Sequence, residues 1–143
     1  MISLRDVVLA VITRLKANAA VAAVVGTRVH RVNLPANPTF PAITVHRVDK
    51  QRNPRSSSIR TARARIQCTA WMQDPNNAGD GLVENLSELI ADCMVIENTM
   101  LTAGTGTVYV VSVVDGGGTP DQNMDLVPPI RMEHRDLNII YDY

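Results

Sequence analysis

Two cysteines and three histidines are the side chains of this sequence best suited to nucleophilic catalysis or to metal binding. Cys68 and Cys93 each fall on the apolar side of an expected strand or helix, which is typical of small core residues. His30, His46 and His134 lie far apart in the chain, and none stands at metal-ligand spacing from a cysteine or another histidine. We therefore expect no catalytic residue, no bound metal and no cofactor, and hence no enzyme.

Carboxylates at helical spacing are the second candidate for chemistry. Glu84, Glu88 and Asp92 follow an i, i+4 row, which could offer ligands to a hard cation or a general acid and base. Acids early in a helix are also favoured by its dipole, and many helices carry a charged, solvated face. We interpret the row as an acidic face that meets solvent or a partner.

Two glycine-rich stretches, residues 104–106 and 116–118, could be mistaken for phosphate-binding loops. Neither has the required glycine spacing between a strand and a helix, and neither is followed by Lys-Ser or Lys-Thr. We expect both to be loop glycines. The second stretch begins an expected flexible, acidic loop over residues 116–125, which contains Asp121 and Asp125.

A basic segment lies in the first half of the chain. Seven basic residues and one acid, Asp49, occur within the nineteen positions 47–65: Arg47, Lys50, Arg52, Arg55, Arg60, Arg63 and Arg65. Such an arm could neutralise nucleic-acid phosphates without reading sequence. Trp71 is the only aromatic residue nearby in the sequence, so the segment lacks a stacking platform for single strands. A solvated hairpin is the simplest alternative, and we favour a docking arm for an acidic protein surface.

The 143-residue chain is formally neutral, but its charges are divided between the two halves of the sequence. Residues 1–72 contain twelve of the fourteen Lys and Arg but only two of the fourteen Asp and Glu. Residues 73–143 contain the other two basic residues and the other twelve acids. If each half is contiguous in space, identical copies could meet with opposite fields facing each other. The alternative is that the halves interleave, as they often do in a small domain.

Length and composition predict one globular domain, residues 1–143. With 45% hydrophobic residues, the chain can bury a core without a disulfide or a metal. No apolar run approaches the roughly 20 residues of a membrane span. The first residues lack the basic and then apolar plan of a signal peptide, so we expect a soluble protein made in a cytoplasm.

Apolar periodicity predicts the elements that position these side chains. Helical spacing predicts amphipathic helices over residues 3–17 and 82–94, and Asn18 can cap a short helix over 19–25. The helix over 82–94 is expected to bury the stripe Leu82, Leu86, Leu89, Ile90 and Cys93. Extended or alternating runs predict strands over residues 29–32, 41–48, 59–72, 107–115 and 130–141.

The order of these elements predicts an α+β fold. Its sheet is expected to be mainly antiparallel, with four to five strands, because hairpin-like links join the strands. An N-terminal helix and one central amphipathic helix are expected to pack on one face of this sheet. The strand over 107–115 is apolar on both faces, so it should be central or be covered by another subunit.

The whole chain resembles the small tail-completion or tail-terminator proteins of long-tailed bacteriophages. The resemblance begins with the opening helix, continues through Ala19–Val29 and reaches the proline stretch that leads into Pro41–Val45. A basic hairpin, the strand over 60–71, one amphipathic helix and the closing strand Ile130–Leu137 follow in the same order. Order and spacing, rather than invariant catalytic residues, mark this family. The extended loop over 116–125 departs from its pattern.

The resemblance implies a structural virion protein without enzymatic activity. Such a protein forms a ring, commonly a hexamer, that caps the head-proximal end of the tail tube and ends tube polymerisation. Its partners would be other copies of the chain, the tail tube protein, and a head-completion or neck protein. DNA would pass through its lumen without sequence-specific binding, and no membrane would be involved. The alternatives are another head-tail connector or neck ring protein, and a sequence-independent DNA-binding module.

We expect the subunit and partner interfaces to draw on the charged residues and on the tryptophan. The candidates are Lys50, Arg52, Arg55, Arg60, Arg63, Arg65, Trp71, Glu84, Glu88, Asp92, Asp121 and Asp125.

Overall fold

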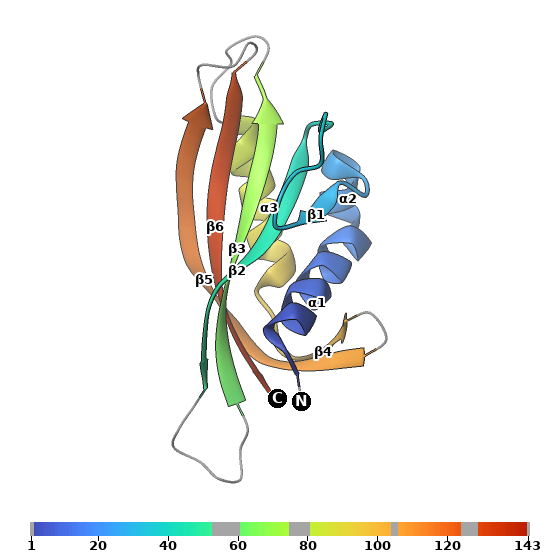
Figure 1. The fold of residues 1–143 in the computed structure, drawn as a ribbon, viewed down its shortest axis with the longest axis vertical. Helices are drawn as coiled ribbons and strands as arrows, with labels where there is room; N and C mark the ends of the chain where they lie inside the picture. The colour runs from blue at the N-terminus through green and yellow to red at the C-terminus, as the bar shows by residue number, and fades with distance from the viewer. Residues whose placement is uncertain (1, 53–60, 75–80, 104–105, 124–128, 143) are drawn as a thin grey trace.

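The structure, a computed structural model, describes residues 2–52, 61–74, 81–103, 106–123 and 129–142. These residues form an α+β fold with three helices and six strands (Figure 1). The helices are α1 (Leu4–Ala17), α2 (Ala19–Val25) and α3 (Gly81–Met94). The strands are β1 (Val29–Arg31), β2 (Ala42–Arg52), β3 (Thr61–Gln73), β4 (Glu97–Ala103), β5 (Gly106–Asn123) and β6 (Ile130–Asp142).

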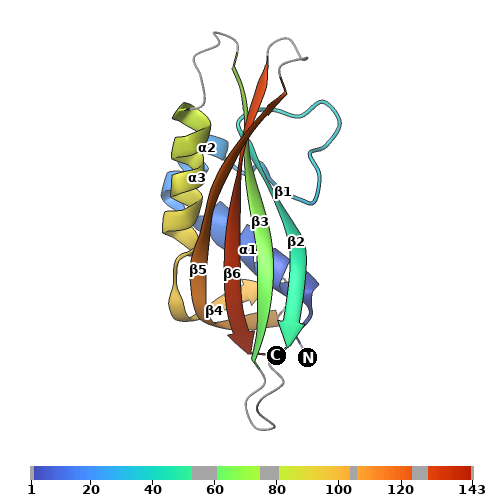
Figure 2. The same ribbon diagram turned by 90° about the vertical axis from the view of Figure 1, so that its left-hand side faces the viewer.

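The strands form one sheet in the order β1-β2-β3-β6-β5-β4. β1 runs parallel to β2, and the other neighbouring pairs are antiparallel. The predicted α+β class and the mainly antiparallel sheet are confirmed, but the predicted four to five strands are too few, because the described sheet has six. The helices pack on one face of the sheet, and no described element covers the opposite face, which we call the open face (Figure 2).

Asn18 joins the first two helices, as predicted. It is the C-cap of α1, and its side chain accepts a hydrogen bond from the backbone N–H of Val21 to begin α2. Ser3 begins α1 through a capping box with Asp6, which satisfies two backbone donors reciprocally. Both helices before residue 26 are therefore fixed by local caps as well as by their apolar faces.

β5 is longer than the sequence predicts. It continues through three consecutive glycines to Asn123 and pairs with β6 along this part. The expected flexible loop over residues 116–125 is therefore wrong as far as residue 123, and Asp125 lies outside the described residues. Pairing with β6 supplies the order that glycine-rich sequence alone does not indicate.

β4 is a strand that the sequence pattern does not predict. Of its residues, only Leu101 and Ala103 are buried, and Asn98 has a left-handed φ of 47°. Two buried positions give a weak period-two signal. Pairing with β5 from Glu97 to Ala103 instead defines this strand.

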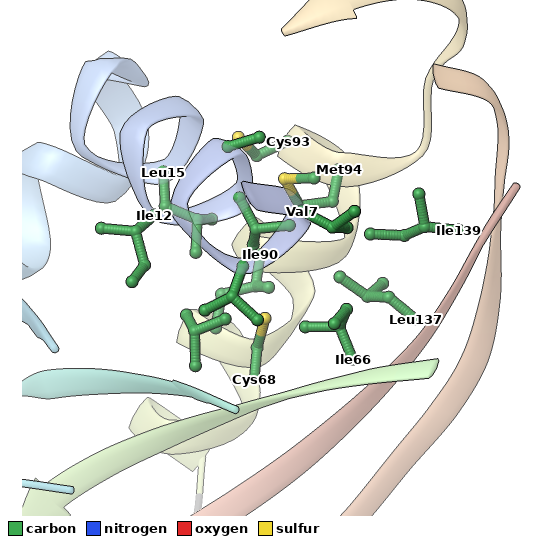
Figure 3. Packing of buried hydrophobic residues seen from close by; sticks show 14 of the residues in the cluster. Val7, Ile12, Leu15, Ile66, Cys68, Ile90, Cys93, Met94, Leu137 and Ile139 are labelled. Atoms are coloured by element: carbon green, nitrogen blue, oxygen red, sulfur yellow. The ribbon is translucent and has the colours of Figure 1, made fainter. Parts of the chain in front are cut away.

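The hydrophobic core lies between the helices and the sheet (Figure 3). Its members come from α1, α3, β3 and β6 among other elements, and include Val7, Leu15, Ile66, Cys68, Ile90, Leu137 and Ile139. One position of the predicted stripe in α3 is wrong, because Leu82 is 63% exposed and its neighbour Val83 is buried instead. In the described part of the chain, no single helix is long and apolar enough to span a membrane, and α1 and α2 qualify only together, with an 84° bend between them.

The strand order keeps the two sequence halves apart. β1, β2 and β3 from the basic half form one side of the sheet, whereas β6, β5 and β4 from the acidic half form the other (Figure 2). α3 belongs to the acidic half and packs on β6, β3 and β5. Of the two arrangements that the sequence leaves open, the sheet therefore has the contiguous one, whereas the helical layer interleaves the halves, because α1 of the basic half packs on β4 and α3 of the acidic half.

Candidate functional site

The predicted basic arm is the β2–β3 hairpin, and its charges divide between the two faces of the sheet. Lys50 lies opposite Ala64 on the helix-covered side, where its Nζ is 5.9 Å from the ring centroid of Tyr141. Arg63 and Arg65 are exposed on the open face. The hairpin therefore carries positive charge on both faces instead of forming one basic stripe.

Both arginines on the open face have neighbours. Nη2 of Arg63 donates to Oε1 of Gln51 over 2.9 Å, and Nη2 of Arg65 lies 3.5 Å from Oδ2 of Asp136. The Arg65 side chain is half exposed, so this ion pair contributes little to stability. Of the remaining predicted bases, Arg52 lies in β2, and Arg55 and Arg60 lie outside the described residues.

Polar side chains continue across the open face from β3 to β5. Nε2 of Gln67 donates to Oδ1 of Asp136 over 3.2 Å. Oγ1 of Thr69 lies 2.8 Å from Nδ1 of His134, whose Nε2 lies 3.4 Å from Oδ2 of Asp121. A hydrogen bond from the Gln122 backbone N–H and another with His134 lower the pKa of Asp121. This stretch of the open face, from Arg65 to Asp121, is therefore polar, and an aromatic residue lies beside it on β3.

Trp71 is that aromatic residue. It lies half-buried on β3, and its Nε1 donates to Oγ1 of Thr44 on β2 over 2.8 Å. Satisfying the indole N–H leaves the ring available for apolar contact, an arrangement that suits an interface.

The predicted acidic face of α3 is present. Glu84, Glu88 and Asp92 are all exposed, with the i, i+4 spacing that places them in one row along the helix. Oε1 of Glu88 accepts a hydrogen bond of 2.8 Å from Nη2 of Arg135. This contact fixes the row next to β5, because Nη1 of Arg135 also donates to both carboxylate oxygens of Asp115 in that strand.

Arg135 is the centre of a cluster that the sequence pattern does not predict. Its side chain is only 6% exposed, and its Nε donates to Oγ of Ser87 over 3.0 Å. Burial acts to lower the pKa of Arg135, but hydrogen bonds with Glu88 and Asp115 outweigh it and raise the pKa. The nearby Glu133 is also buried, with Oε2 at 4.0 Å from Nη2 of Arg135.

The alternation of side chains along β6 provides a sequence signal for the burial of Arg135 and Glu133. Leu137, Ile139 and Tyr141 alternate on the buried face of the strand. Counting back by twos from these residues places Arg135 and Glu133 on the same face. Their charges suggest solvent exposure instead. Ion pairs with Glu88 of α3 and Asp115 of β5 make the burial of Arg135 favourable, and Glu133 lies beside this buried cation.

Glycines let β5 approach the cluster. A register shift between Asp115 and Gly118 bulges the strand, and Gly117 has a φ of 93°. A Cβ at Gly118 would lie 3.2 Å from Nη2 of Arg135 and 3.3 Å from the Glu133 carboxylate. Gly116 and Gly118 thus allow close packing against β6, whereas Gly117 supplies the left-handed backbone conformation of the bulge.

The cysteines and histidines do not come together as a reactive centre in the described residues. Burial raises the pKa of Cys68 to about 12, and burial also raises that of Cys93. Burial and the charge of His134 lower the pKa of His46. No group of three His, Cys, Asp or Glu suited to a metal ion occurs in the described part of the chain. Among the described residues, Pro120, Asp121, Gln122 and Arg131 line a surface hollow of about 350 Å³, and these four include no nucleophile paired with a base.

Comparison with known proteins gives a family and a structural neighbour. The family model described as "Tail completion protein gp17" matches residues 9–123. No curated protein matches the sequence. A chain from the structure described as "Virion of native gene transfer agent (GTA) particle" is similar with a TM-score of 0.65 and 17% identity, over 97% of this chain and 95% of that chain. At this identity, the likeness supports the fold.

Proposed function

This chain belongs to the family of tail completion protein gp17, and from that premise we propose that it forms a hexameric ring at the head-proximal end of a tail tube. The ring ends polymerisation of the tube protein and presents the joining surface for a head-completion or neck protein. DNA passes through its lumen without sequence-specific contacts. The family match over residues 9–123 is the observation that carries this proposal.

The charge distribution supports assembly from identical copies. A closed head-to-tail ring needs two different, complementary surfaces on each subunit. The strands of the basic half form one lateral edge of the sheet, and those of the acidic half form the other edge. This arrangement provides two edges of opposite charge. Opposite fields steer association and fix its orientation.

A structural, non-enzymatic role fits the side chains that the structure describes. Cys68 and Cys93 are buried, and their raised pKa values keep them protonated at neutral pH. The polar groups of the open face are hydrogen-bonded to one another across neighbouring strands. Such a surface suits contact with another protein.

Charge reversal on the open face tests the role of the hairpin in assembly. We expect a virus that carries Arg63→Glu and Arg65→Glu to produce tails that fail to complete or to join heads, because two exposed positive charges become negative. Lys16→Glu, an exposed change in α1, is the control and should leave assembly intact. Electron microscopy of particles gives the readout. Normal yields of joined particles from the double variant would contradict a role for this arm.

A further inference from the structure

Two strands have long outer edges without a neighbouring strand in the described part of the sheet. β1 covers β2 only from Ile43 to Val45, which leaves residues 46–52 without an outer neighbour. β4 pairs with β5 only as far as Ser112, which leaves residues 114–123 of β5 without an outer neighbouring strand. Unpaired strand edges are the places where another chain adds most readily.

The edge formed by β1 and β2 is basic, and we call Arg31, Arg47 and Lys50 the basic edge. Asp49 is the only acid within these two strands. Arg31 and Arg47 are exposed. Positive charge therefore borders the open stretch of β2.

The opposite edge is acidic, and we call Glu84, Glu88, Asp92, Asp115 and Asp121 the acidic edge. α3 and β5 contain these five acids and no Lys or Arg. Arg135 binds both Glu88 and Asp115, so the acidic row of α3 lies beside the open stretch of β5. One buried cation balances part of this charge and leaves the edge negative.

We propose that the acidic edge of one copy of this chain binds the basic edge of a second copy. This inference rests on the proposed function, because it names the contact that holds the ring together. Opposite charge favours the pairing of unlike edges, and like charge opposes the pairing of two acidic or two basic edges. Each subunit then uses two different surfaces, which is the requirement for a head-to-tail ring.

Side-chain charge carries the contact more than a continuous strand ladder does. β2 has a register shift between Arg47 and Asp49, β5 has one between Asp115 and Gly118, and Pro120 lacks a backbone N–H. These features interrupt regular strand addition. The open stretch of β2 lies at the end of the sheet where Arg52 pairs with Ala62 of β3. The open stretch of β5 lies at the opposite end, where Asn123 pairs with Ile130 of β6. Neighbouring copies joined through these stretches are therefore shifted relative to one another along the strand direction.

Complementary charge reversal tests this contact. Glu84→Lys with Asp92→Lys reverses two charges of the acidic edge, and Arg31→Glu with Arg47→Glu reverses two charges of the basic edge. These changes leave the Arg135 cluster untouched. Arg5→Glu with Lys16→Glu, on the exposed side of α1, is the control that shifts net charge as the second pair does. Circular dichroism establishes that each variant is folded.

Light scattering at low and high salt measures the mass of each protein. We expect the wild type and the α1 control to form oligomers that dissociate at high salt, because about 1 M salt shortens the Debye length to roughly 3 Å. Each edge variant alone should be monomeric, and an equimolar mixture of the two should regain the oligomer. A monomeric wild type at both salts, edge variants that assemble alone, or a mixture that stays monomeric would overturn the inference.

The same proteins separate this inference from the proposed function. If the edges associate but tails form normally without the protein, the contact stands and the role at the tail fails. If the edge variants support normal tails, the role stands and the contact is wrong.

Discussion

Nη2 of Arg135 donates a 2.8 Å hydrogen bond to Oε1 of Glu88, which joins the buried side of β6 to the exposed acidic row of α3. The same guanidinium binds Asp115 of β5 and Ser87 of α3. A single buried cation thus holds a helix and two strands in a fixed arrangement. The acidic edge through which we propose that copies of this tail structural protein meet is built on that arrangement.

Removing the cation should destabilise the fold. Arg135→Met leaves the buried Glu133 without its neighbouring cation, and we expect a loss of about 2 kcal/mol in the free energy of unfolding. The partial exposure of Glu88, at 60%, keeps the loss below that of a fully buried pair. Urea unfolding gives the measurement, with the exposed Arg5→Met as control. Equal midpoints for the two variants would show that the cluster contributes nothing.

The close approach of β5 gives a second prediction. Gly118→Ala places a methyl group against Arg135 and Glu133, and we expect it to cost about 1–3 kcal/mol in stability. A Cβ at Gly81 meets nothing within 4 Å, so Gly81→Ala at the start of α3 should have little effect or be stabilising. Thermal unfolding compares them. Indistinguishable melting temperatures would mean that the strand accommodates a side chain at position 118.

The capping box at α1 predicts a dependence on pH. Hydrogen bonds from the side chain and backbone of Ser3 lower the pKa of Asp6 below its usual range. A lowered pKa in the folded state stabilises the protein fully above the unfolded-state pKa, and this contribution is lost as pH falls through the folded value. Ser3→Ala should therefore cost about 1 kcal/mol at neutral pH, where the cap is intact.

The difference between wild type and Ser3→Ala should shrink under acid. Protonated Asp6 accepts hydrogen bonds less well, so part of the cap is already lost in the wild type once the pH falls through the lowered pKa of Asp6. Urea unfolding at neutral and acidic pH measures both differences. A difference that stays constant between the two conditions would show that Asp6 ionisation is not coupled to the cap.

Burial makes Cys68 inert. Its pKa of about 12 keeps the thiol protonated at neutral pH, and its side chain is fully enclosed in the core. We expect iodoacetamide to modify it only after denaturation, as followed by mass spectrometry. Thr102→Cys, at an exposed position of β4, provides a reactive reference in the same protein. Native labelling of Cys68 at the rate of this reference would be inconsistent with the packing.

Local signals in the sequence predict the first part of the fold well. Ser3, Asn18 and the apolar spacing of α1 act within a few residues, so they can be read from sequence directly. The continuation of β5 through Gly116 depends on pairing with β6, which is a long-range effect. β4 likewise has too few buried positions for its sequence pattern to predict a strand, and its strand is defined by pairing with β5.

The candidate interface could be predicted by charge but not by geometry. The acidic row of α3 follows from its i, i+4 spacing, and the structure exposes it as expected. The split of Lys50 from Arg63 across two faces depends on the register of β2 against β3, which a bulge alters. Burial of Arg135 depends on partners from two distant segments, and sequence alone does not bring these together.

Tail length in particles made without this protein is the most direct test of its role. Deleting its gene and measuring tubes by electron microscopy should give tubes of uncontrolled length that do not join heads, and supplying the protein in trans should restore uniform, joined tails. Tails of normal length attached to heads in its absence would contradict the proposal that the ring ends tube polymerisation and joins the head.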